Sequence, residues 1–458
     1  MRKIFLGRKV LMSAVVLSVM AITGVVASPG AFAKTHAVPR ASANAKYTVC
    51  SHGCPYKSIQ AAVTAAMYPG EIITIGPGHY AENVTVTASV TLKGAGKRTV
   101  LYPAVSNPAP NGCGSSSLCG GSASNIILVA ANNVTIENIT LEGANPALAG
   151  SGTLVDGARI NARNGIIDDY LVGDFNNLTV SNVIVRDIYL RGIEVTYDNV
   201  PGQTFTLTHN TVTNVQADPS SVAMLNYGDS GVMSYNTVTN ASDAISANWS
   251  TGTQFLDNRI SKSGSGIHTD NNGGSGGIAD TIQGNSVSAC TKDGYGIWVF
   301  VPYVSATVEN NSVKGCYVGL GVYGSGVSGQ GPTFSGNVVN GTGATTSDLS
   351  GTYGAYVTTD QLGYGPANVN ASLTGNSFQS FTTGLFVTQT TGGQATVTAS
   401  PNNSFLRDKT GANGGTGTVV NATHDWWGCS KGPNTPGCST AIGTVLYKPW
   451  LTTKPPKS

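Results

Sequence analysis

The sequence is notably poor in charge. Only 10% of its residues are Asp, Glu, Lys or Arg, and the formal net charge is +2. A chain without a basic field does not attract nucleic acid, so we expect no nucleic-acid partner. Ordinary disorder requires high charge with low hydrophobicity, whereas 40% of this chain is hydrophobic. The composition therefore predicts a folded protein.

Long apolar runs are also missing, apart from one at the N-terminus. Four basic residues flank the start of an apolar stretch from about Val10 to Ala27, and Ala31-Phe32-Ala33 forms a small-x-small cleavage pattern. This order is typical of a signal peptide, so the mature chain is expected to begin at Lys34. A retained anchor is the alternative, although the stretch is near the lower length limit for crossing a bilayer. We expect a secreted, extracellular chain without a membrane span after cleavage.

The chain does contain a repeated sequence motif. Residues 206–212, 232–238 and 254–260 share the order apolar, two polar or small residues, Asn, any residue, apolar. The motif returns around Asn285, Asn311, Asn337 and Asn376, with a degraded copy at Asn403 and shorter variants at Asn138 and Asn182.

The spacing of these asparagines predicts the fold. Successive positions from Asn182 to Asn337 differ by 28, 26, 22, 27, 26 and 26 residues, which suits a coil of three short strands and three turns. Stacked coils form parallel ladders over a continuous apolar core. Asn suits the corner because it tolerates left-handed backbone, and stacked amides hydrogen-bond to each other. We predict an all-β, single-stranded right-handed parallel β-helix.

The eight cysteines support this arrangement, and none stands in a zinc-ligand pattern. Cys290 and Cys316 each lie five residues after a repeat asparagine, so they should stack about 4.8 Å apart, within reach of a disulfide. Two buried free thiols are the alternative. Close spacing suggests the other pairs, which are Cys50 with Cys54, Cys113 with Cys119, and Cys429 with Cys438.

Both ends of the coil need a cover. Residues 56–67 read as a short capping helix with Ser58 as its N-cap, and Pro69-Gly70 stops it. Trp426-Trp427 beside the last disulfide reads as the C-terminal cap, with sugar stacking as the alternative use of the tryptophans. The expected parts are a signal peptide over 1–33, a flexible lead over 34–48, an N-terminal cap with the first coils over 49–125, β-helix repeats over 126–412 and a C-terminal cap over 413–458.

These residues carry a family resemblance. The openings at 58–62 and 76–82, the Asn-marked coils and the closing Trp426-Trp427-Gly428 with Gly432-Pro433 resemble secreted right-handed β-helix repeat proteins of the pectin-lyase-like superfamily. That superfamily includes polysaccharide lyases, glycoside hydrolases, esterases and adhesins, so the resemblance implies a fold and not a reaction. Asp168-Asp169 is similar to the paired Asp of polygalacturonases, but the accompanying Gly-His-Gly and Arg-x-Lys are absent.

A second repeated motif, Gly-apolar-x-apolar, predicts another strand in each coil, and these strands together form one outer face of the β-helix. Its first apolar residues, such as Ile267 and Ile297, should point inward, and the residues after them should point outward. We predict a row of exposed aromatics for stacking on sugar rings, with cover by a loop such as 144–170 as the alternative. The candidate substrate-binding residues are Asn248, Trp298, Phe300, Tyr323, Tyr356 and Phe386.

The same face carries candidate catalytic residues, namely His268, Asp270 and Glu194. Two residues apart on one strand, His268 and Asp270 would lie roughly 6.6 Å apart and form an acid/base pair. Glu194, three coils away at about 14 Å, is too far to complete a glycosidase pair unless a loop residue such as Asp168 or Asp169 supplies the second carboxyl.

A lyase would instead use His268 as a base, together with a cation at the substrate carboxyl. The candidates for that cation are Arg159, Arg163, Arg191 and a Ca²⁺ ion bound by Asp270, Asn271 and Asn272. No cofactor is otherwise required.

Two functions follow from the sequence. The first is a secreted monomer that binds, and in its catalytic version cleaves, an extracellular polysaccharide in a lyase-like or hydrolase-like reaction. The second is a non-catalytic structural or adhesive β-helix at the cell surface. The missing enzyme signatures favour the second function, and the aromatic row with His268 and Asp270 favours the first.

Overall fold

The computed structural model describes residues 46–197, 202–228, 230–271, 278–301, 306–324, 331–360, 363 and 365–456. The predicted signal peptide and most of the predicted lead, residues 34–45, lie outside this range. No helix among the described residues is long and apolar enough to span a membrane.

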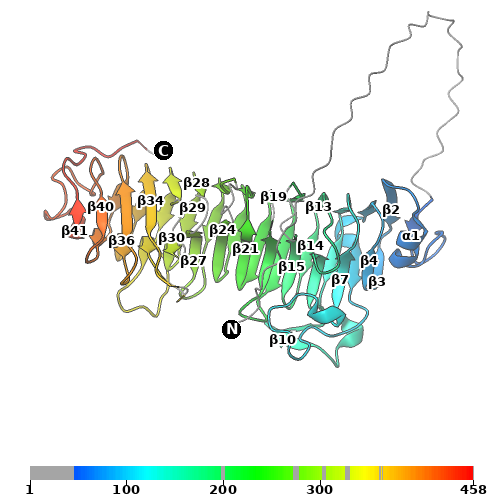
Figure 1. Cartoon of the computed structure of the whole chain (residues 1–458). Helices are drawn as coiled ribbons and strands as arrows, with labels where there is room; N and C mark the ends of the chain where they lie inside the picture. The colour runs from blue at the N-terminus through cyan, green and yellow to red at the C-terminus, as the bar shows by residue number, and fades with distance from the viewer. Residues whose placement is uncertain are drawn as a thin grey trace, which may run out of the picture. The chain divides into compact units, whose positions relative to one another are not determined.

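The described chain forms three long sheets in which every strand pairs parallel to its neighbours (Figure 1). Each complete coil contributes one strand to each sheet, whereas the terminal coils contribute fewer; β16, β17 and β18, for example, lie in sheets A, B and C. Among the strands of the described residues, the one antiparallel pair is the hairpin of β10 (Thr153–Val155) and β11 (Ala158–Ile160). The predicted parallel β-helix is therefore confirmed.

Sheet A has 15 strands. They are β1 (Thr48–Val49), β2 (Glu71–Ile75), β5 (Val90–Lys93), β8 (Thr135–Glu137), β13 (Leu178–Ser181), β16 (Thr204–Thr208), β19 (Ser230–Ser234), β22 (Gln254–Leu256), β25 (Thr281–Gln283), β28 (Thr307–Glu309), β31 (Thr333–Ser335), β34 (Val369–Thr374), β37 (Ala395–Ala399), β40 (Val419–Asn421) and β42 (Val445–Leu446).

Sheet B has 12 strands. They are β3 (Gly78–Ala81), β6 (Thr99–Tyr102), β9 (Thr140–Glu142), β14 (Ile184–Arg186), β17 (Thr211–Val215), β20 (Thr237–Ala241), β23 (Arg259–Ser261), β26 (Ser286–Ser288), β29 (Ser312–Lys314), β32 (Val338–Asn340), β35 (Ser377–Gln379) and β38 (Ser404–Leu406).

Sheet C has 13 strands. They are β4 (Val84–Val86), β7 (Asn125–Val129), β12 (Asn164–Asp168), β15 (Arg191–Thr196), β18 (Val222–Tyr227), β21 (Asp243–Ser250), β24 (Ser265–Asn271), β27 (Tyr295–Val301), β30 (Val318–Gly324), β33 (Tyr353–Thr358), β36 (Thr383–Thr388), β39 (Thr410–Gly414) and β41 (Thr440–Gly443).

The interior of the coil is a continuous apolar core. In sheet C the residues in register on successive coils form columns along the axis, and the innermost column is fully buried. The residues that the sequence placed inward all lie in this core, namely Ile193, Ile245, Ile267, Ile297 and Leu385.

A ladder of buried asparagines runs along one corner. Each side chain donates to the next rung; Asn236 Nδ2, for example, lies 3.0 Å from Asn258 Oδ1 and 2.9 Å from the Leu207 carbonyl oxygen. Its own Oδ1 accepts from the backbone N–H of Asn210 at 2.9 Å. The rungs are Asn210, Asn236, Asn258, Asn285, Asn311, Asn337, Asn376 and Asn403. Buried donors and acceptors are thus paired without water.

Two details of the predicted ladder are wrong. Asn138 and Asn182 are not rungs, because Ser181 pairs with Thr208, so Asn182 matches His209 and Val183 occupies the rung position. The rung asparagines also do not adopt left-handed backbone. The residue before each rung does so instead, as in His209 (φ 57°), Tyr235 (φ 56°) and Asn310 (φ 53°). The residue before each rung therefore makes the bend, and the rung asparagine itself makes the ladder hydrogen bonds.

All four predicted disulfides are present, and there are no free cysteines among the described residues. Cys290 and Cys316 bridge adjacent coils with their Cα atoms 4.8 Å apart, which is the spacing of stacked strands. The other three are Cys50–Cys54, Cys113–Cys119 and Cys429–Cys438.

The two caps form where they were expected. Helix α1 (Ile59–Ala65) begins after Ser58, whose side chain accepts from the Ala61 N–H, and its buried residues cover the first coil. The chain already joins sheet A at Thr48, inside the expected lead. At the other end Trp427 is fully buried and packs on Phe405 with ring centroids 4.9 Å apart. Gly411 permits this contact, since a Cβ there would lie 2.9 Å from the indole.

The ladder ends on an acid instead of an amide. Asp425 Oδ1 accepts from the backbone N–H of Asn403 at 2.8 Å, whereas its buried Oδ2 has no hydrogen-bond partner among the described residues. Burial raises the pKa of Asp425 to about 8. The terminal rung is therefore largely protonated at neutral pH.

We expect Asn311→Ala to lower the free energy of unfolding by about 3 kcal/mol, because it leaves several buried ladder groups unpaired. Chemical denaturation monitored by circular dichroism measures this change. The neighbouring Asn310→Gly is the matched control, since glycine adopts the left-handed backbone freely, and it should cost less than about 1 kcal/mol. Equal losses in both variants would contradict the ladder as the main source of corner stability.

The terminal rung predicts a pH dependence. An acid whose pKa is raised in the folded chain makes folding less favourable as pH rises from about 4 to 8. We expect Asp425→Asn to stabilise the protein at pH 8 by roughly 1 to 3 kcal/mol and to have much less effect at pH 4. Thermal unfolding of both proteins across this range tests it, and a variant effect that does not change with pH would exclude titration of Asp425.

Candidate functional site

The outer face of sheet C carries the candidate residues in two columns. In the first, Glu194 is followed on successive coils by Leu225, Ser246, His268, Trp298, Gly321, Tyr356 and Phe386. In the second, Tyr227 is followed by Asn248, Asp270, Phe300, Tyr323 and Thr358. In these columns Trp298 lies beside His268, and Phe300 lies beside Asp270.

The predicted exposure of the aromatic row is wrong. Tyr323 is 1% exposed and Phe300 is 7% exposed, and Trp298, Tyr356 and Phe386 are half-buried. The rings cover each other, and three more tyrosines, Tyr295, Tyr317 and Tyr353, join them in one ring cluster.

The ring cluster explains most of this aromatic content by packing. Tyr353 stacks on Phe386 at 5.0 Å between centroids, and Trp298 lies 5.8 Å from Tyr323. Within the alternative cover, residues 144–170, Asn145 bonds to the Pro103 carbonyl, Asn161 bonds to Ser106, and Tyr170 stacks on Tyr227 at the start of the second column, so these contacts do not cover the ring cluster. The aromatics on this face are therefore chiefly a structural cluster.

His268 is the centre of the polar part of the face. Its Nδ1 lies 3.0 Å from Ser246 Oγ and 3.8 Å from Asp243 Oδ2, and its ring stacks on Trp298 at 4.1 Å. The other ring nitrogen, Nε2, is buried and has no hydrogen-bond partner among the described residues. A neutral imidazole that donates from Nδ1 keeps Nε2 as a proton acceptor.

The predicted partner of His268 is replaced by a different one. Asp270 accepts a short hydrogen bond from the Trp249 N–H, and burial raises its pKa to about 6. The carboxylate nearest Nδ1 belongs to Asp243, one coil earlier. The sequence analysis missed Asp243 because it considered only the outward positions that follow the inward apolar residue of each strand, and Asp243 is the first residue of β21. Asp243 lies three residues before Ser246, and Ser246 is in register with His268, so this spacing could have indicated the contact from the sequence.

Glu194 does not join this centre. It is 4% exposed and three coils from His268, and burial raises its pKa to about 7. The Arg191 Nε atom lies 3.8 Å from its Oε2. The three predicted catalytic residues therefore do not converge on one substrate bond.

Asp168 and Asp169, the candidates for the second carboxyl of a glycosidase pair, are not placed as expected. Asp168 is not in a loop but ends β12, in register with Val129 and Val195, which belong to the core. Burial, followed by the charge of Asp169, raises its pKa to about 8. Asp169 is 5% exposed and accepts from the Leu171 N–H, so neither presents a free carboxylate to solvent.

The predicted cations are also committed elsewhere. The Arg163 guanidinium donates to the carbonyls of Pro108, Gly114 and Ser116, and Arg191 donates to the Ser220 carbonyl. Arg159 lies on the hairpin strand β11.

For the predicted Ca²⁺ site, Asn272 lies outside the described residues. No group of three or more His, Cys, Asp or Glu in the described ranges is arranged to hold a metal ion.

The exposed rings near His268 are ones that the sequence analysis did not choose. Trp249 is 44% exposed, and Tyr170, 38% exposed, stacks on Tyr227 at 6.5 Å between centroids. We call Tyr170, Tyr227 and Trp249 the aromatic edge. Trp249 has left-handed backbone (φ 54°), and its N–H is held by Asp270. Such backbone is rare for a bulky residue and is commonly kept for a function.

Comparisons with known proteins find similar folds. No protein-family model and no curated protein matches the sequence. The A-module of a mannuronan C-5 epimerase from Azotobacter vinelandii is 15% identical, with 85% of this chain and 94% of that chain covered and a TM-score of 0.45. A mutant of the periplasmic alginate epimerase AlgG is 13% identical, with 84% and 79% covered and a TM-score of 0.45.

The catalytic domain of a GH87 alpha-1,3-glucanase is 15% identical, with 76% of this chain and 66% of that chain covered and a TM-score of 0.46. Identities and TM-scores this low carry no argument about the activity of this chain.

The two groups of aromatics should respond differently to truncation. We expect Tyr323→Ala to lower the free energy of unfolding by about 3 kcal/mol, because it empties a buried site in the ring cluster. Trp249→Ala, at an exposed position, should change it by less than about 0.5 kcal/mol. Denaturant titration measures both values. A large loss for Trp249→Ala would instead assign a structural role to the aromatic edge.

Proposed function

We propose that this chain is a secreted protein that binds an extracellular polysaccharide across the outer face of sheet C. The observation that carries the proposal is the aromatic edge beside His268 and Asp270. Exposed rings on a rigid sheet suit the apolar faces of sugar rings, and nearby polar groups orient their hydroxyls. Asn248, which is half-buried and accepts a 2.7 Å hydrogen bond from the buried Ser246, supplies such a group between the edge and His268.

We further propose that the bound polysaccharide is cleaved by proton abstraction at His268. Ser246 and Asp243 lie at Nδ1, so Nε2 is the nitrogen that would take a proton from the carbon next to a uronate carboxyl. The carbon–oxygen bond on the adjacent carbon then breaks, its electrons leave with the oxygen, and a carbon–carbon double bond forms. The departing oxygen takes a proton from water.

Nε2 has no hydrogen-bond partner among the described residues, so its lone pair is available to accept a proton. The atom is buried, so a substrate reaches it when the rings packed around His268 move aside.

A non-catalytic structural role is the second candidate. The observation in its favour is the ring cluster, because eight rings that pack on each other need no ligand to explain them. In that case the protein would act through the length and rigidity of its coil. The two candidates differ in what they predict for Trp249 and His268.

Binding is tested by affinity electrophoresis in gels that contain polygalacturonate, alginate or a neutral glucan. We expect Tyr170→Ala and Trp249→Ala each to weaken retention on at least one polymer by about tenfold, which corresponds to 1.4 kcal/mol. Tyr235→Ala is the matched control, because Tyr235 is 54% exposed but lies at the corner between sheets A and B. Unchanged migration of both edge variants on every polymer would remove the proposed binding face.

Cleavage is tested with uronate polymers by following the ultraviolet absorbance of unsaturated products. His268→Asn should lower the rate by roughly 10² to 10⁴-fold, as expected for loss of a general base. Asp243→Asn should retain the fold and lower the rate less, because it changes only the partner of Nδ1. Activity that survives His268→Asn, in a variant whose unfolding is normal, would exclude His268 as the base.

A further inference from the structure

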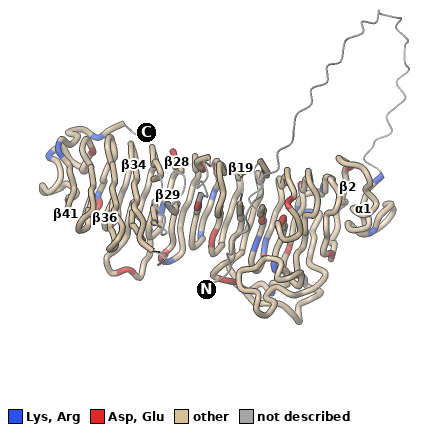
Figure 2. Tube along the Cα trace, viewed as in Figure 1, with Lys and Arg blue, Asp and Glu red and all other residues tan. Residues whose placement is uncertain are grey.

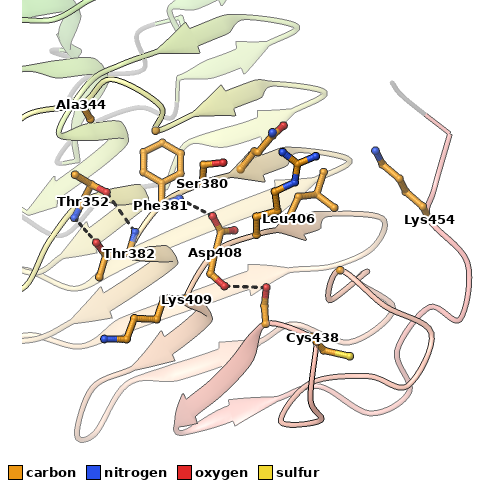
Figure 3. A pocket seen from close by; sticks show the side chains of 16 residues that line it. Ala344, Thr352, Ser380, Phe381, Thr382, Leu406, Asp408, Lys409, Cys438 and Lys454 are labelled. Carbon is orange, nitrogen blue, oxygen red and sulfur yellow. Dashed lines mark hydrogen bonds between the residues drawn. The ribbon is translucent and has the colours of Figure 1, made fainter.

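A hollow of about 840 Å³ lies near the C-terminal cap, away from the aromatic edge (Figure 3). Its walls come from the turns between sheets B and C on successive coils, at residues 341–352, 379–382 and 406–409, and from cap residues 428 and 437–439. Thr352 and Thr382 hold two of these turns together, with the Thr352 N–H 3.1 Å from Thr382 Oγ1. The hollow is thus built on the rigid coil and not on one loop.

Three cations line the hollow, namely Arg407, Lys409 and Lys454. All three are exposed, and within the described ranges none of them lies within 4.0 Å of an acidic oxygen. Arg407 has left-handed backbone (φ 59°), which is uncommon for a long side chain. The tube coloured by charge shows blue segments at this end of the coil (Figure 2).

Asp408 is the one acid among the described residues that line the wall, and it does little to cancel this charge. Asp408 is 5% exposed, and its Oδ1 accepts from the Phe381 N–H at 2.8 Å. Its Oδ2 is buried and has no hydrogen-bond partner among the described residues, and burial raises the pKa of Asp408 to about 7. At mildly acidic pH the wall therefore carries three positive charges and a mostly neutral carboxyl.

The rest of the wall offers neutral hydrogen-bonding groups. Thr352, Gln379, Ser380 and Thr382 line the hollow together with the cations and carry hydroxyl and amide groups. Such a lining suits a ligand with many hydroxyls and a few negative charges, and the volume is within the range of small-molecule and oligosaccharide sites.

We propose that this hollow is a binding site for negatively charged polysaccharide, separate from the face of sheet C. Cations placed among hydroxyl and amide groups recognise carboxylated or sulfated sugar units, with salt-sensitive affinity. Nucleic acid is the less suitable ligand, because the chain carries only a +2 net charge and the three cations form no extended track for a phosphate backbone.

The site extends the proposed function without depending on it. The strand of Thr410 lies five coils beyond the strand of His268, or about 24 Å along the axis at normal strand spacing. One long acidic chain can therefore contact both places, and the second contact would hold the polymer on the coil.

The test uses the full mature chain and the triple variant Arg407→Gln, Lys409→Gln and Lys454→Gln. The control is Lys314→Gln, Lys431→Gln and Lys448→Gln, which removes the same charge from exposed positions outside the hollow. Binding of size-selected oligogalacturonate, a sulfated oligosaccharide, a neutral glucan oligosaccharide and single-stranded oligo-dT is measured by titration calorimetry at low and moderate salt.

We expect the hollow variant to lose at least tenfold in affinity for a carboxylated or sulfated oligosaccharide, while the control loses less than threefold. The difference between these two anions identifies the charged group. Equal losses in both triple variants, no binding of either anionic saccharide by the wild type, or preferential binding of oligo-dT would each overturn the proposal. The hollow substitutions are also made in a Trp249→Ala background, where they should cost the same factor because the two places bind independently, so failure of the sheet C face and failure of the hollow are distinguishable.

Discussion

The structure depends on one constraint, which is that residues about 26 positions apart must lie directly above one another. The asparagine ladder enforces it, because each buried amide pairs with the amides above and below and with a backbone carbonyl. A slip of one residue would break every rung and turn the apolar column outward. Stability and register therefore come from the same hydrogen bonds, and the disulfide between Cys290 and Cys316 follows that register.

The same constraint turns the outer face of sheet C into an ordered surface. Side chains that are distant in sequence form columns, so Ser246, His268 and Trp298 meet through their registers alone. Large rings on adjacent coils are close enough to cover each other, which converts an aromatic row into a cluster. The rings that remain accessible to solvent are those of the aromatic edge, where Trp249 and Tyr170 are exposed.

Low charge gives the few charged groups unusual environments. Burial raises the pKa of several acids, including Glu194, Asp408 and Asp425, so these side chains hold protons near neutral pH. A raised pKa stabilises the folded state at acidic pH and less so as pH rises. The exposed cations Arg407, Lys409 and Lys454 have no acidic oxygen within 4.0 Å among the described residues, which is the basis for the anion site proposed at that end.

The sequence by itself predicted the coil, its columns and the inward residues, because a fixed period places equal residues at equal positions. The same period paired Cys290 with Cys316, whereas close spacing suggested the other three cysteine pairs. The sequence also identified the face that carries His268. It did not determine which rings are covered, which carboxylate lies at His268, or that Asp168 faces the core. Those depend on how side chains of neighbouring coils and turns pack against each other, and periodicity alone contains no information about that packing. The cationic hollow likewise joins turns and a cap that only the tertiary structure brings together.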